Sequence, residues 1–413
     1  MSILTQLRSL TSDQRNAFLA AYLGWTLDAF DFFVVVFVLK DIEHEFHATA
    51  KAVSLALTFT LACRPLGAFL FGLAADRFGR RLPLMVDVLL YSALELASGF
   101  APTLTSFLVL RALFGVAMGG EWGLGASLAL ESAPAKMRGL LSGILQQGYP
   151  VGYLLGAVVY PFVVPHLGWR WMFFVGVLPA LLSLFIRTKV KESPAWLEGR
   201  RNRERVDFGA VLRQHGGLFF YLVLLMTAFT FMSHGTQDLY PKFLQVQRHF
   251  KPPTVSAIVI VYNVGALLGG ITVGALSQKI GRRKAIVIFA LLALPIIPLW
   301  AFSHSPYLLA LGAFLMQFCV QGAWGVIPAH LTELSPSALR GTFTGFAYQL
   351  GNLLSSVNLT LQTGIAVGYG GEKHPNFALA MAEVIVVVLV AVAAVTALGR
   401  EARDVEFAPG VAQ

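Results

Sequence analysis

Long apolar stretches alternate with short polar segments along the whole chain. As helices, these stretches can cross a hydrocarbon core of about 30 Å, which needs roughly 20 residues. The sequence lacks the alternating segments of about 10 residues that are typical of membrane barrels. The pattern therefore predicts an all-α integral membrane protein with twelve transmembrane helices, at about 17–39, 52–75, 82–100, 104–130, 138–161, 169–187, 217–240, 253–275, 284–301, 305–330, 340–364 and 376–398.

The composition agrees with this interpretation. Hydrophobic residues make up 56% of the 413 residues, charged residues make up 13%, and the mean hydropathy is +0.68. Soluble globular domains do not reach these values. The first fifteen residues lack the pattern of a removed signal peptide, so we expect the first span to direct membrane insertion.

The second half of the chain repeats the first at a constant offset of 202 residues, the separation of Gly72 and Gly274. The segment 72–81 reads Gly-Leu-Ala-Ala-Asp-Arg-Phe-Gly-Arg-Arg, and 274–283 reads Gly-Ala-Leu-Ser-Gln-Lys-Ile-Gly-Arg-Arg. Long internal repeats of this kind are typical of transporters. The same offset relates seven further identical pairs: Trp122 and Trp324, Glu131 and Glu333, Pro134 and Pro336, Arg138 and Arg340, Gly139 and Gly341, Gly143 and Gly345, and Gln147 and Gln349.

The repeat predicts two six-helix bundles, at 1–187 and 217–398. Between them, residues 188–216 form a hydrophilic linker rich in Arg and Glu, which we expect to be a solvated cytoplasmic segment. The polar tail at 399–413 is expected to be disordered and cytoplasmic.

The net charge of +9 is explained by the distribution of basic residues between the two sides of the membrane. If the N-terminus is cytoplasmic, 22 of the 31 Lys and Arg residues lie on the cytoplasmic side and two lie inside spans. This bias follows the positive-inside rule, so we expect both termini in the cytoplasm and no nucleic-acid partner. The remaining seven basic residues lie on the other side: Lys40, Lys51, Arg170, Lys242, Arg248, Lys251 and Lys373.

Several kinds of chemistry are disfavoured by the sequence. Cys63 and Cys319 both fall within spans and form no CxxC motif, which argues against a disulfide framework or a metal site. The sequence contains neither a phosphate-binding G-x-x-x-x-G-K-[ST] motif nor a metalloprotease H-E-x-x-H motif. We therefore expect no cofactor, no ATP-driven pumping by this chain and no enzyme activity.

Asp28 and Asp31 lie three residues apart near the middle of the first span, on one face of its helix. A charged carboxylate in hydrocarbon is costly, so this face should meet a wet cavity or a cation. Two carboxylates this close do not both ionise readily, which makes the pair a candidate proton carrier. The alternative is a structural ion pair with a neighbouring arginine.

Two arginines are also expected inside spans. Arg64 in the second span can bind the carboxylate of a substrate or that of Asp28 or Asp31. Arg111 lies in the fourth span, where glycines four and eight residues later favour tight helix packing. Its counter-ion in the fold is expected to be Glu121.

Amide and imidazole side chains supply further candidates. Gln147 and Gln349 are the polar pair that the repeat preserves inside spans, and Asn352 shares a helix face with Gln349. These amides can bind substrate, or they can hydrogen-bond between helices. In the seventh span His234 and Asp238 are at i and i+4, where imidazole can titrate near neutral pH or simply pair with the carboxylate.

The segment 72–81 resembles the signature of the major facilitator superfamily between its second and third helices. The resemblance covers nearly the whole chain and implies a conformational latch between the two halves. Asp76 should meet an arginine or a helix N-terminus there. The latch residues implied by the resemblance are Gly72, Asp76, Arg77, Gly79, Arg80 and Arg81. The superfamily also associates an arginine at the position of Arg111 with proton coupling.

The segment 230–242 resembles the signature of lactate and pyruvate symporters within the sialate:proton symporter family, Asn-x-x-Ser/Thr-His-x-Ser/Thr-Gln-Asp followed by Thr. Thr230 and Lys242 replace the first and last residues of the signature. The matching residues are Ser233, His234, Thr236, Gln237 and Asp238.

Together these features predict a proton-coupled symporter of a small monocarboxylate, acting as a monomer in a bacterial-type inner membrane. We expect Arg64, Gln147, His234, Gln237, Gln349 and Asn352 to bind the anion, and Asp28, Asp31, Asp238 and Arg111 to handle the proton. The alternatives are a symporter of a larger acid such as sialic acid and a membrane solute sensor without transport.

Overall fold

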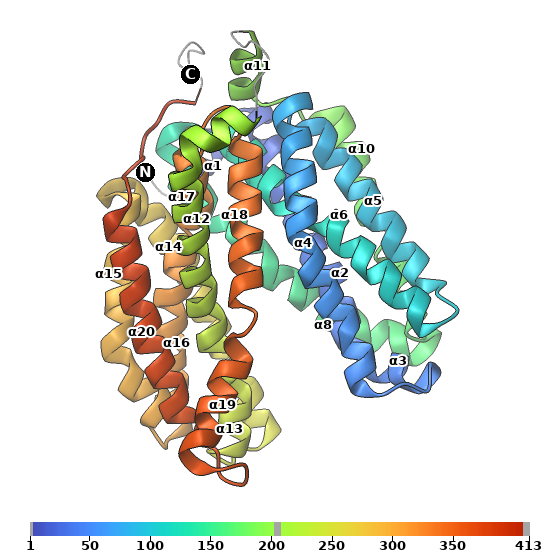
Figure 1. Ribbon diagram of the computed structural model, residues 1–413, viewed down its shortest axis with the longest axis vertical. Coiled ribbons are helices and arrows are strands. Elements are labelled where there is room, and N and C mark those ends of the chain that lie inside the picture. The colour runs from blue at the N-terminus through green and yellow to red at the C-terminus, as the bar shows by residue number, and fades with distance from the viewer. Residues whose placement is uncertain (1–2, 202–207, 408–413) are drawn as a thin grey trace.

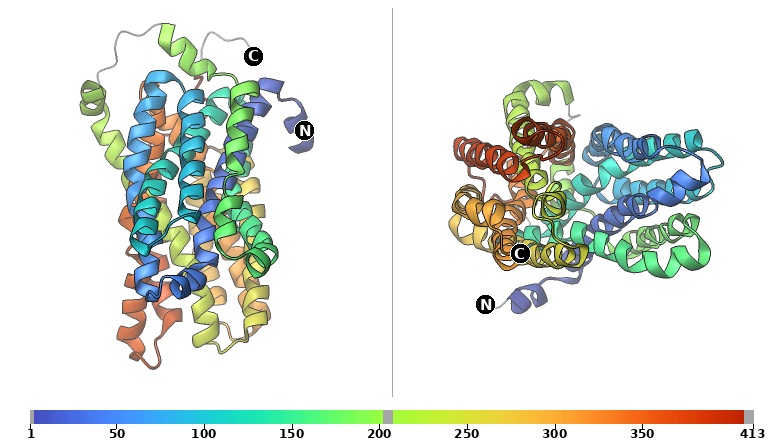
Figure 2. Two further views of the ribbon diagram at one scale, coloured as in Figure 1. Left: turned by 90° about the vertical axis from the view of Figure 1, so that its right-hand side faces the viewer. Right: turned by 90° about the horizontal axis from the view of Figure 1, so that it is seen from below.

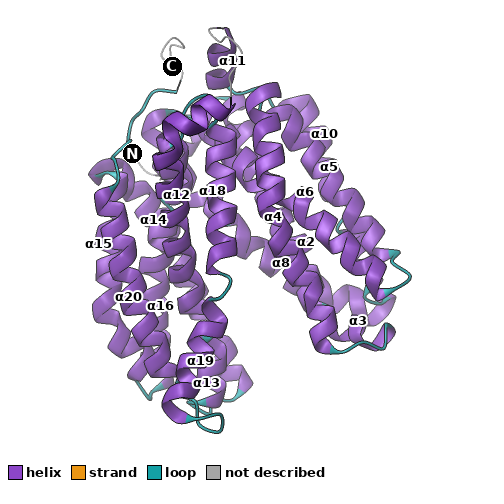
Figure 3. Cartoon of the chain, viewed as in Figure 1, coloured by secondary structure: helices purple, strands orange, loops and turns teal. Residues whose placement is uncertain are grey.

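The computed structural model describes residues 3–201 and 208–407, and this part of the chain forms helices and no strands (Figure 3). Two helical bundles lie side by side when viewed along the helices (Figure 2). The bundles meet at the end that carries both termini and diverge towards the other end (Figure 1). An all-α, two-bundle architecture is what the apolar pattern and the repeat predicted.

The N-terminal bundle follows a short helix, α1 (Ile3–Arg8). The bundle and its surface helices comprise α2 (Ser12–Phe37), α3 (Leu39–Glu45), α4 (Ala50–Phe78), α5 (Arg81–Gly99), α6 (Leu104–Ser132), η1 (Ala135–Met137), α7 (Arg138–Gln146), α8 (Gly148–Leu167), α9 (Arg170–Val175) and α10 (Pro179–Lys189). The connecting helix is α11 (Pro194–Arg201).

The C-terminal bundle repeats this order. It comprises α12 (Phe208–Gln237), α13 (Tyr240–Val246), α14 (Pro252–Ile280), α15 (Arg282–Ala293), η2 (Leu294–Ile296), η3 (Pro298–Phe302), α16 (Pro306–Trp324), α17 (Ile327–Leu334), α18 (Arg340–Ser355), α19 (Asn358–Gly370) and α20 (Phe377–Leu398).

Within the described residues, eleven helical segments are long and apolar enough to cross a membrane. The span predicted at 340–364 is not among them because the helix is interrupted at Ser356 and Val357. Its two parts, α18 and α19, lie end to end and run the length of the bundle (Figure 1). The expected chain path is therefore present, with a break in the eleventh helix.

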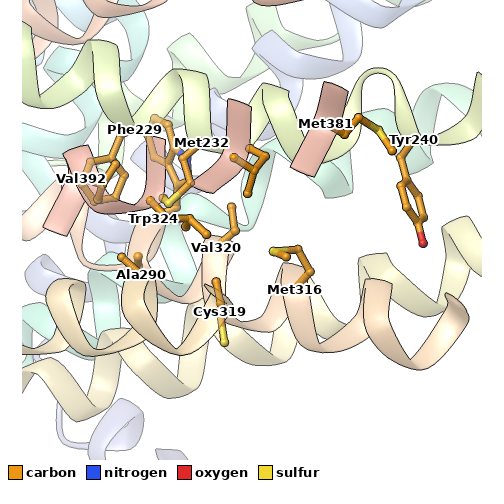
Figure 4. Packing of buried hydrophobic residues seen from close by; sticks show 14 of the residues in the cluster. Phe229, Met232, Tyr240, Ala290, Met316, Cys319, Val320, Trp324, Met381 and Val392 are labelled. Carbon is orange, nitrogen blue, oxygen red and sulfur yellow. The ribbon is translucent and has the colours of Figure 1, made fainter. Parts of the chain in front are cut away.

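Glycines bring helices into close contact in both bundles. A Cβ atom on Gly119 of α6 would lie 2.0 Å from the carbonyl oxygen of Arg64 in α4. One on Gly269 of α14 would lie 2.2 Å from the carbonyl oxygen of Phe318 in α16. The C-terminal bundle adds a large apolar core, in which Phe229, Met232, Met316 and Trp324 are buried (Figure 4).

The linker and the tail differ from the sequence-based expectation. Helix α10 ends at Lys189 and α12 begins at Phe208, so the connection is shorter than 188–216, and Ser193 within it is fully buried. In the described part of the tail, Phe407 is only 8% exposed. The charge pattern predicted solvation because it did not reveal the buried ion pairs that these segments cover.

Candidate functional site

Asp76 joins the two bundles at the end where they meet. Its carboxylate accepts hydrogen bonds from the backbone N–H groups of Gly341 and Thr342, each at 2.9 Å, and from the Thr342 hydroxyl at 2.7 Å. Arg80 binds the same carboxylate at 2.9 Å. Asp76 therefore meets both expected partners, an arginine and the N-terminus of α18, where a negative charge is favourable.

The repeat-related position has the same geometry without the charge. The amide oxygen of Gln278 accepts the backbone N–H of Gly139 at 3.1 Å and a guanidinium N–H of Arg282 at 2.8 Å. Each bundle thus presents a polar side chain to the first residues of a helix in the other bundle. We call the contacts made by the two repeated segments, 72–81 and 274–283, the two latches.

Buried ion pairs hold each latch. In the first, Arg80 binds Glu131 at 3.0 and 3.2 Å, and Arg340 of the other bundle adds a third bond to Glu131 at 3.1 Å. In the second, Arg282 binds Glu333 at 2.9 Å through two nitrogens. Burial disfavours the charged guanidinium of Arg80, but the carboxylates of Glu131 and Asp76 outweigh burial and raise its pKa.

The remaining residues of the first latch make different contacts. A Cβ on Gly72 would lie 2.7 Å from Cα of Thr342, so glycine permits the approach of α4 to α18. Gly79 ends α4 at φ +99°, a conformation that favours glycine. Arg81 donates to the carbonyl of Ile186 at 3.3 Å. Arg77 is exposed, and its guanidinium lies beside the Phe78 ring.

The linker contributes to the first latch, which the sequence reading missed. Glu192 accepts the backbone N–H groups of Arg80 at 2.8 Å and Arg81 at 3.2 Å, and so caps α5. Ser193 donates its hydroxyl to Glu131. The Lys-Glu-Ser-Pro turn at 191–194 carried the signal, because an acid followed by serine and proline commonly marks a helix start.

Charged side chains are buried within the N-terminal bundle. Asp28 and Arg64 are paired at 3.5 Å, so in this conformation Arg64 faces an internal carboxylate. Asp31 is fully buried, and among the described residues neither of its carboxylate oxygens has a hydrogen-bond partner. The structural alternative, an arginine pair, is therefore present for Asp28 and not for Asp31.

Arg111 pairs with Glu95 rather than with Glu121. Its guanidinium donates to the Glu95 carboxylate at 2.7 Å and to the Ser98 hydroxyl at 2.6 Å, and it lies 4.2 Å from the centre of the Phe114 ring. The expectation that Glu121 is the counter-ion of Arg111 is therefore wrong. Glu121 lies on the same helix ten residues, or about 15 Å, further along, whereas Glu95 comes from the neighbouring α5.

Five aromatic side chains from both bundles meet between the latches and the diverging ends, and we call them the central aromatic layer: Trp25, Trp122, Tyr149, Trp324 and Tyr348. The Trp122 and Tyr348 rings stack across the two bundles with centroids 3.9 Å apart. Trp25 and Trp324 approach Tyr348 edge-on, at 6.4 and 5.8 Å.

Several buried donors at this layer have no acceptor among the residues that the structure describes. They are Trp25 Nε1, Trp324 Nε1, Gln349 Nε2 and Arg64 Nε. The indole N–H of Trp122, by contrast, donates to Gln146 at 3.3 Å. A buried donor without an acceptor costs about 1–3 kcal/mol, so an incoming acceptor would be favourable here.

Polar side chains at the C-terminal end of α12 point in different directions. His234 and Asp238 contact each other at 3.0 Å and are half exposed, with 51% and 38% of their side-chain surfaces accessible. Gln237 instead donates to Ser233 at 3.2 Å and to Gln317 of α16 at 3.1 Å. The structure thus brings His234 to Asp238 and separates both from Gln237.

The sequence reading missed two amides in this cluster. Gln321 donates to Ser233 at 2.9 Å, and Gln317 donates to Thr236 at 3.0 Å. Both lie on α16, four residues apart and therefore on one helix face. That spacing was visible in the sequence, although no repeat partner or motif drew attention to it.

The repeat-related glutamines lie in different surroundings. Gln147 donates to the Gly143 carbonyl at 3.2 Å, and a Cβ on Gly270 of the other bundle would lie 1.9 Å from its amide nitrogen. The Gln349 oxygen accepts from Asn352 at 3.2 Å, while Asn352 accepts from Thr230 at 3.1 Å. Gln147 therefore packs between the bundles, whereas the amide nitrogen of Gln349 is buried without an acceptor among the described residues.

The family model of the Major Facilitator Superfamily matches residues 21–357, with a second match at 223–412. The chain belongs to the Major Facilitator Superfamily. The expected fold and superfamily are thereby confirmed.

Superfamily members with similar sequences are described as transporters rather than enzymes. The chain is 29% identical over 408 residues to the carboxylic acid transporter protein homolog of Saccharomyces cerevisiae, a match that covers 91% of this chain and 65% of the yeast protein. The chain thus spans less than two thirds of that relative. It is 29% identical over 365 residues to the sialic acid transporter NanX of Escherichia coli, covering 88% of this chain and 90% of NanX.

A superfamily member of known structure has the same fold. The proton:xylose symporter XylE superposes with a TM-score of 0.76 at 19% identity, covering 95% of this chain and 97% of XylE. At this identity the similarity concerns the fold. The site residues described above are therefore interpreted from their own geometry.

Proposed function

We propose that this protein is a proton-coupled secondary transporter of small organic anions, most simply a monocarboxylate such as lactate or pyruvate. It acts as a monomer in the cell membrane, with both termini and the two latches on the cytoplasmic side. The structure then corresponds to a carrier closed towards the cytoplasm, and transport exchanges this state with one in which the latches have separated.

One observation carries the proposal: hydrogen-bond donors from both bundles are buried near the central aromatic layer without an acceptor among the described residues. Two indole N–H groups, one primary amide and one guanidinium nitrogen lack partners among the described residues. A carboxylate is an acceptor-only group, and charged acceptors form the stronger hydrogen bonds. An organic anion at this layer would satisfy donors from both bundles, which supports binding between them.

The proton is assigned to the N-terminal bundle. An unpaired carboxylate is tolerated in a buried place in its protonated form, and Asp31 is such a group. Asp28 is held by Arg64, the guanidinium that could alternatively bind the substrate carboxylate. We propose that the substrate competes with Asp28 for Arg64, so that anion binding and proton binding to Asp28 favour each other.

The remaining site residues are assigned to the entrance, to the polar lining and to charge balance. His234 and Asp238 are accessible at the end where the bundles diverge, so they can meet the anion and the proton on entry. Gln237 and Asn352 form the polar lining between this entrance and the central aromatic layer. Arg111, paired with Glu95, balances the charge near Asp31.

A larger substrate is the second candidate. The similarity to NanX supports sialic acid, whereas the similarity to the yeast protein supports a simpler carboxylic acid. We favour the smaller acid because the segment 230–242 matches the lactate and pyruvate signature at five positions.

Uptake of radiolabelled lactate into proteoliposomes tests the proposal, with and without an inward proton gradient and with pyruvate and sialic acid as competitors. We expect gradient-dependent uptake that pyruvate blocks and that Asp238→Asn abolishes. Competition by sialic acid alone would overturn the choice of substrate. Failure of every acid to move, despite binding to the solubilised protein, would favour a membrane sensor.

A further inference from the structure

The tail beyond α20 follows a fixed course across the end of the molecule where the bundles meet (Figure 1). Glu401 accepts the backbone N–H of Arg283 at 3.0 Å and so caps α15. Arg403 donates to the carbonyl of Lys279 at 2.6 Å. Asp404 turns the chain at φ +66° and accepts from the side chain of Gln278 at 2.7 Å. The second latch therefore anchors the tail.

The tail ends its described course between two arginines. The Arg138 guanidinium lies 3.6 Å from the centre of the Phe407 ring, and the Arg340 guanidinium lies 4.0 Å from it. Arg138 also donates to the carbonyl of Val405. Arg138 begins α7 in the N-terminal bundle, whereas Arg340 begins α18 in the C-terminal bundle. Phe407 thus contacts both bundles at once.

The repeat-related arginines Arg138 and Arg340 make different cross-bundle contacts. Arg340 reaches across the bundles to Glu131 at 3.1 Å. The repeat-related pair would be Arg138 with Glu333, and no such ion pair is present in the described part of the chain. Both arginines donate to a backbone carbonyl at 3.1 Å, Arg138 to Leu130 and Arg340 to Thr332. Where Arg340 adds the ion pair, Arg138 binds the tail. One cross-bundle contact is therefore an ion pair, and the other is made by the tail.

We propose that residues 403–407 form a strap that stabilises the carrier with its two latches closed. The tail is attached to the C-terminal bundle, so its contacts with Arg138 must break before the two bundles can separate at this end. Loss of the Phe407 ring removes two cation–π contacts, each of which contributes more when shielded from water. The strap depends on neither the transported substrate nor the proton.

The test measures how often the closed end opens. The reporter is Ala75→Cys in the full-length chain with Cys63→Ala and Cys319→Ala, because Ala75 is fully buried beside Gly341 of the other bundle. A maleimide fluorophore added to the detergent-solubilised protein can reach this thiol only when the bundles separate. We expect Phe407→Ala to raise the labelling rate about tenfold.

Matched variants separate a strap from a general loosening of the protein. Glu406→Ala changes an exposed neighbour of Phe407 and should leave the rate within about twofold, while Phe407→Trp keeps an aromatic face and should keep the slow rate. Phe407→Leu keeps apolar bulk without that face and should label as fast as Phe407→Ala. A thiol at Leu398, which is 86% exposed, should label equally in all folded variants. Equal Ala75→Cys labelling in Phe407→Ala and Glu406→Ala would overturn the proposal.

Discussion

The two bundles share one backbone plan, but they carry different chemistry inside it. Apart from Glu131 of the first latch, the N-terminal bundle buries five carboxylates in its spans: Asp28, Asp31, Asp87, Glu95 and Glu121. At the repeat-related positions the C-terminal bundle has no ionisable side chain: Thr230, Ser233, Phe289, Ile297 and Ala323. Arg64 and Arg111 likewise correspond to Ala266 and Ala313.

The C-terminal bundle replaces charge with neutral hydrogen-bonding groups. Thr230 and Ser233 stand where Asp28 and Asp31 stand in the first half, and both hydroxyls bond to amides. Hydroxyl and amide groups do not titrate near neutral pH, so their hydrogen bonds persist as the pH changes. His234 and Asp238, further along α12, are titratable, and they are accessible to solvent.

Both halves of the repeat retain the buried ion pair of the latch. Arg80 binds Glu131 at 3.0 Å, and Arg282 binds Glu333 at 2.9 Å, in equivalent positions. The latches are thus nearly the same in both halves, whereas the buried carboxylates Asp28 and Asp31 lie in the N-terminal half only.

The largest expected effect comes from breaking a buried ion pair of the N-terminal bundle. Arg111→Gln leaves Glu95 without its cation, and removal of one partner of a buried pair typically costs about 3–5 kcal/mol. We expect a large fall in the apparent Tm of the detergent-solubilised protein, measured by intrinsic fluorescence.

The control for this prediction removes both charges. Glu95→Gln combined with Arg111→Gln leaves two neutral amides that can still bond to each other and should recover most of the lost Tm. A double variant that melts as low as Arg111→Gln would show that shape, rather than an uncompensated charge, controls stability here.

The comparison also explains what could be predicted from the sequence. Hydrophobicity and spacing along the chain fix the spans, and the repeat aligns the halves, so the two-bundle fold and the partners of Asp76 could be inferred. These features depend on periodicity, which is visible in one dimension.

Contacts between distant helices could not be inferred in the same way. Glu121 was expected to be the counter-ion of Arg111 through the fold, yet the partner of Arg111 is Glu95, which comes from the neighbouring α5. The burial of Ser193 and Phe407 depends on where the linker and the tail cross the latches. The signal for such contacts lies in tertiary packing, which a charge pattern does not specify.

The next prediction sharpens the comparison by making the two bundles chemically alike. Asp31→Asn preserves the shape of a buried, unpaired group but cannot carry a proton. We expect gradient-driven lactate uptake to fall at least about tenfold, because a tenfold loss corresponds to only about 1.4 kcal/mol of coupling. Exchange of internal for external lactate at equal pH should stay within about twofold of the unmodified protein.

Ser233→Ala is the matched change at the repeat-related position. Ser233 accepts hydrogen bonds from Gln237 and Gln321 and carries no titratable group, so the dependence on the proton gradient should remain intact. If Asp31→Asn kept its response to the gradient, or Ser233→Ala lost it, the assignment of proton chemistry to the N-terminal bundle would be wrong.

The smallest expected effect is a difference between Trp122 and Trp324, two repeat-related residues of the central aromatic layer. Trp324 Nε1 has no acceptor among the described residues, whereas Trp122 Nε1 already donates to Gln146 at 3.3 Å. Trp324→Phe keeps an aromatic ring between Phe229 and Tyr348 but removes a free donor. We expect the KM for lactate exchange to rise about threefold to tenfold, which corresponds to about 0.7–1.4 kcal/mol and lies within the net contribution of one hydrogen bond.

Trp122→Phe removes a donor that is already satisfied within the protein, so the same assay should show a KM within about twofold of the unmodified value. Its larger consequence should be structural, since the Trp122 ring stacks on Tyr348 at 3.9 Å and joins the two bundles. A rise in KM for Trp122→Phe equal to that for Trp324→Phe would assign the effect to ring packing. A rise confined to Trp324→Phe requires the substrate to accept the free indole N–H, because the two residues otherwise occupy equivalent places in the repeat.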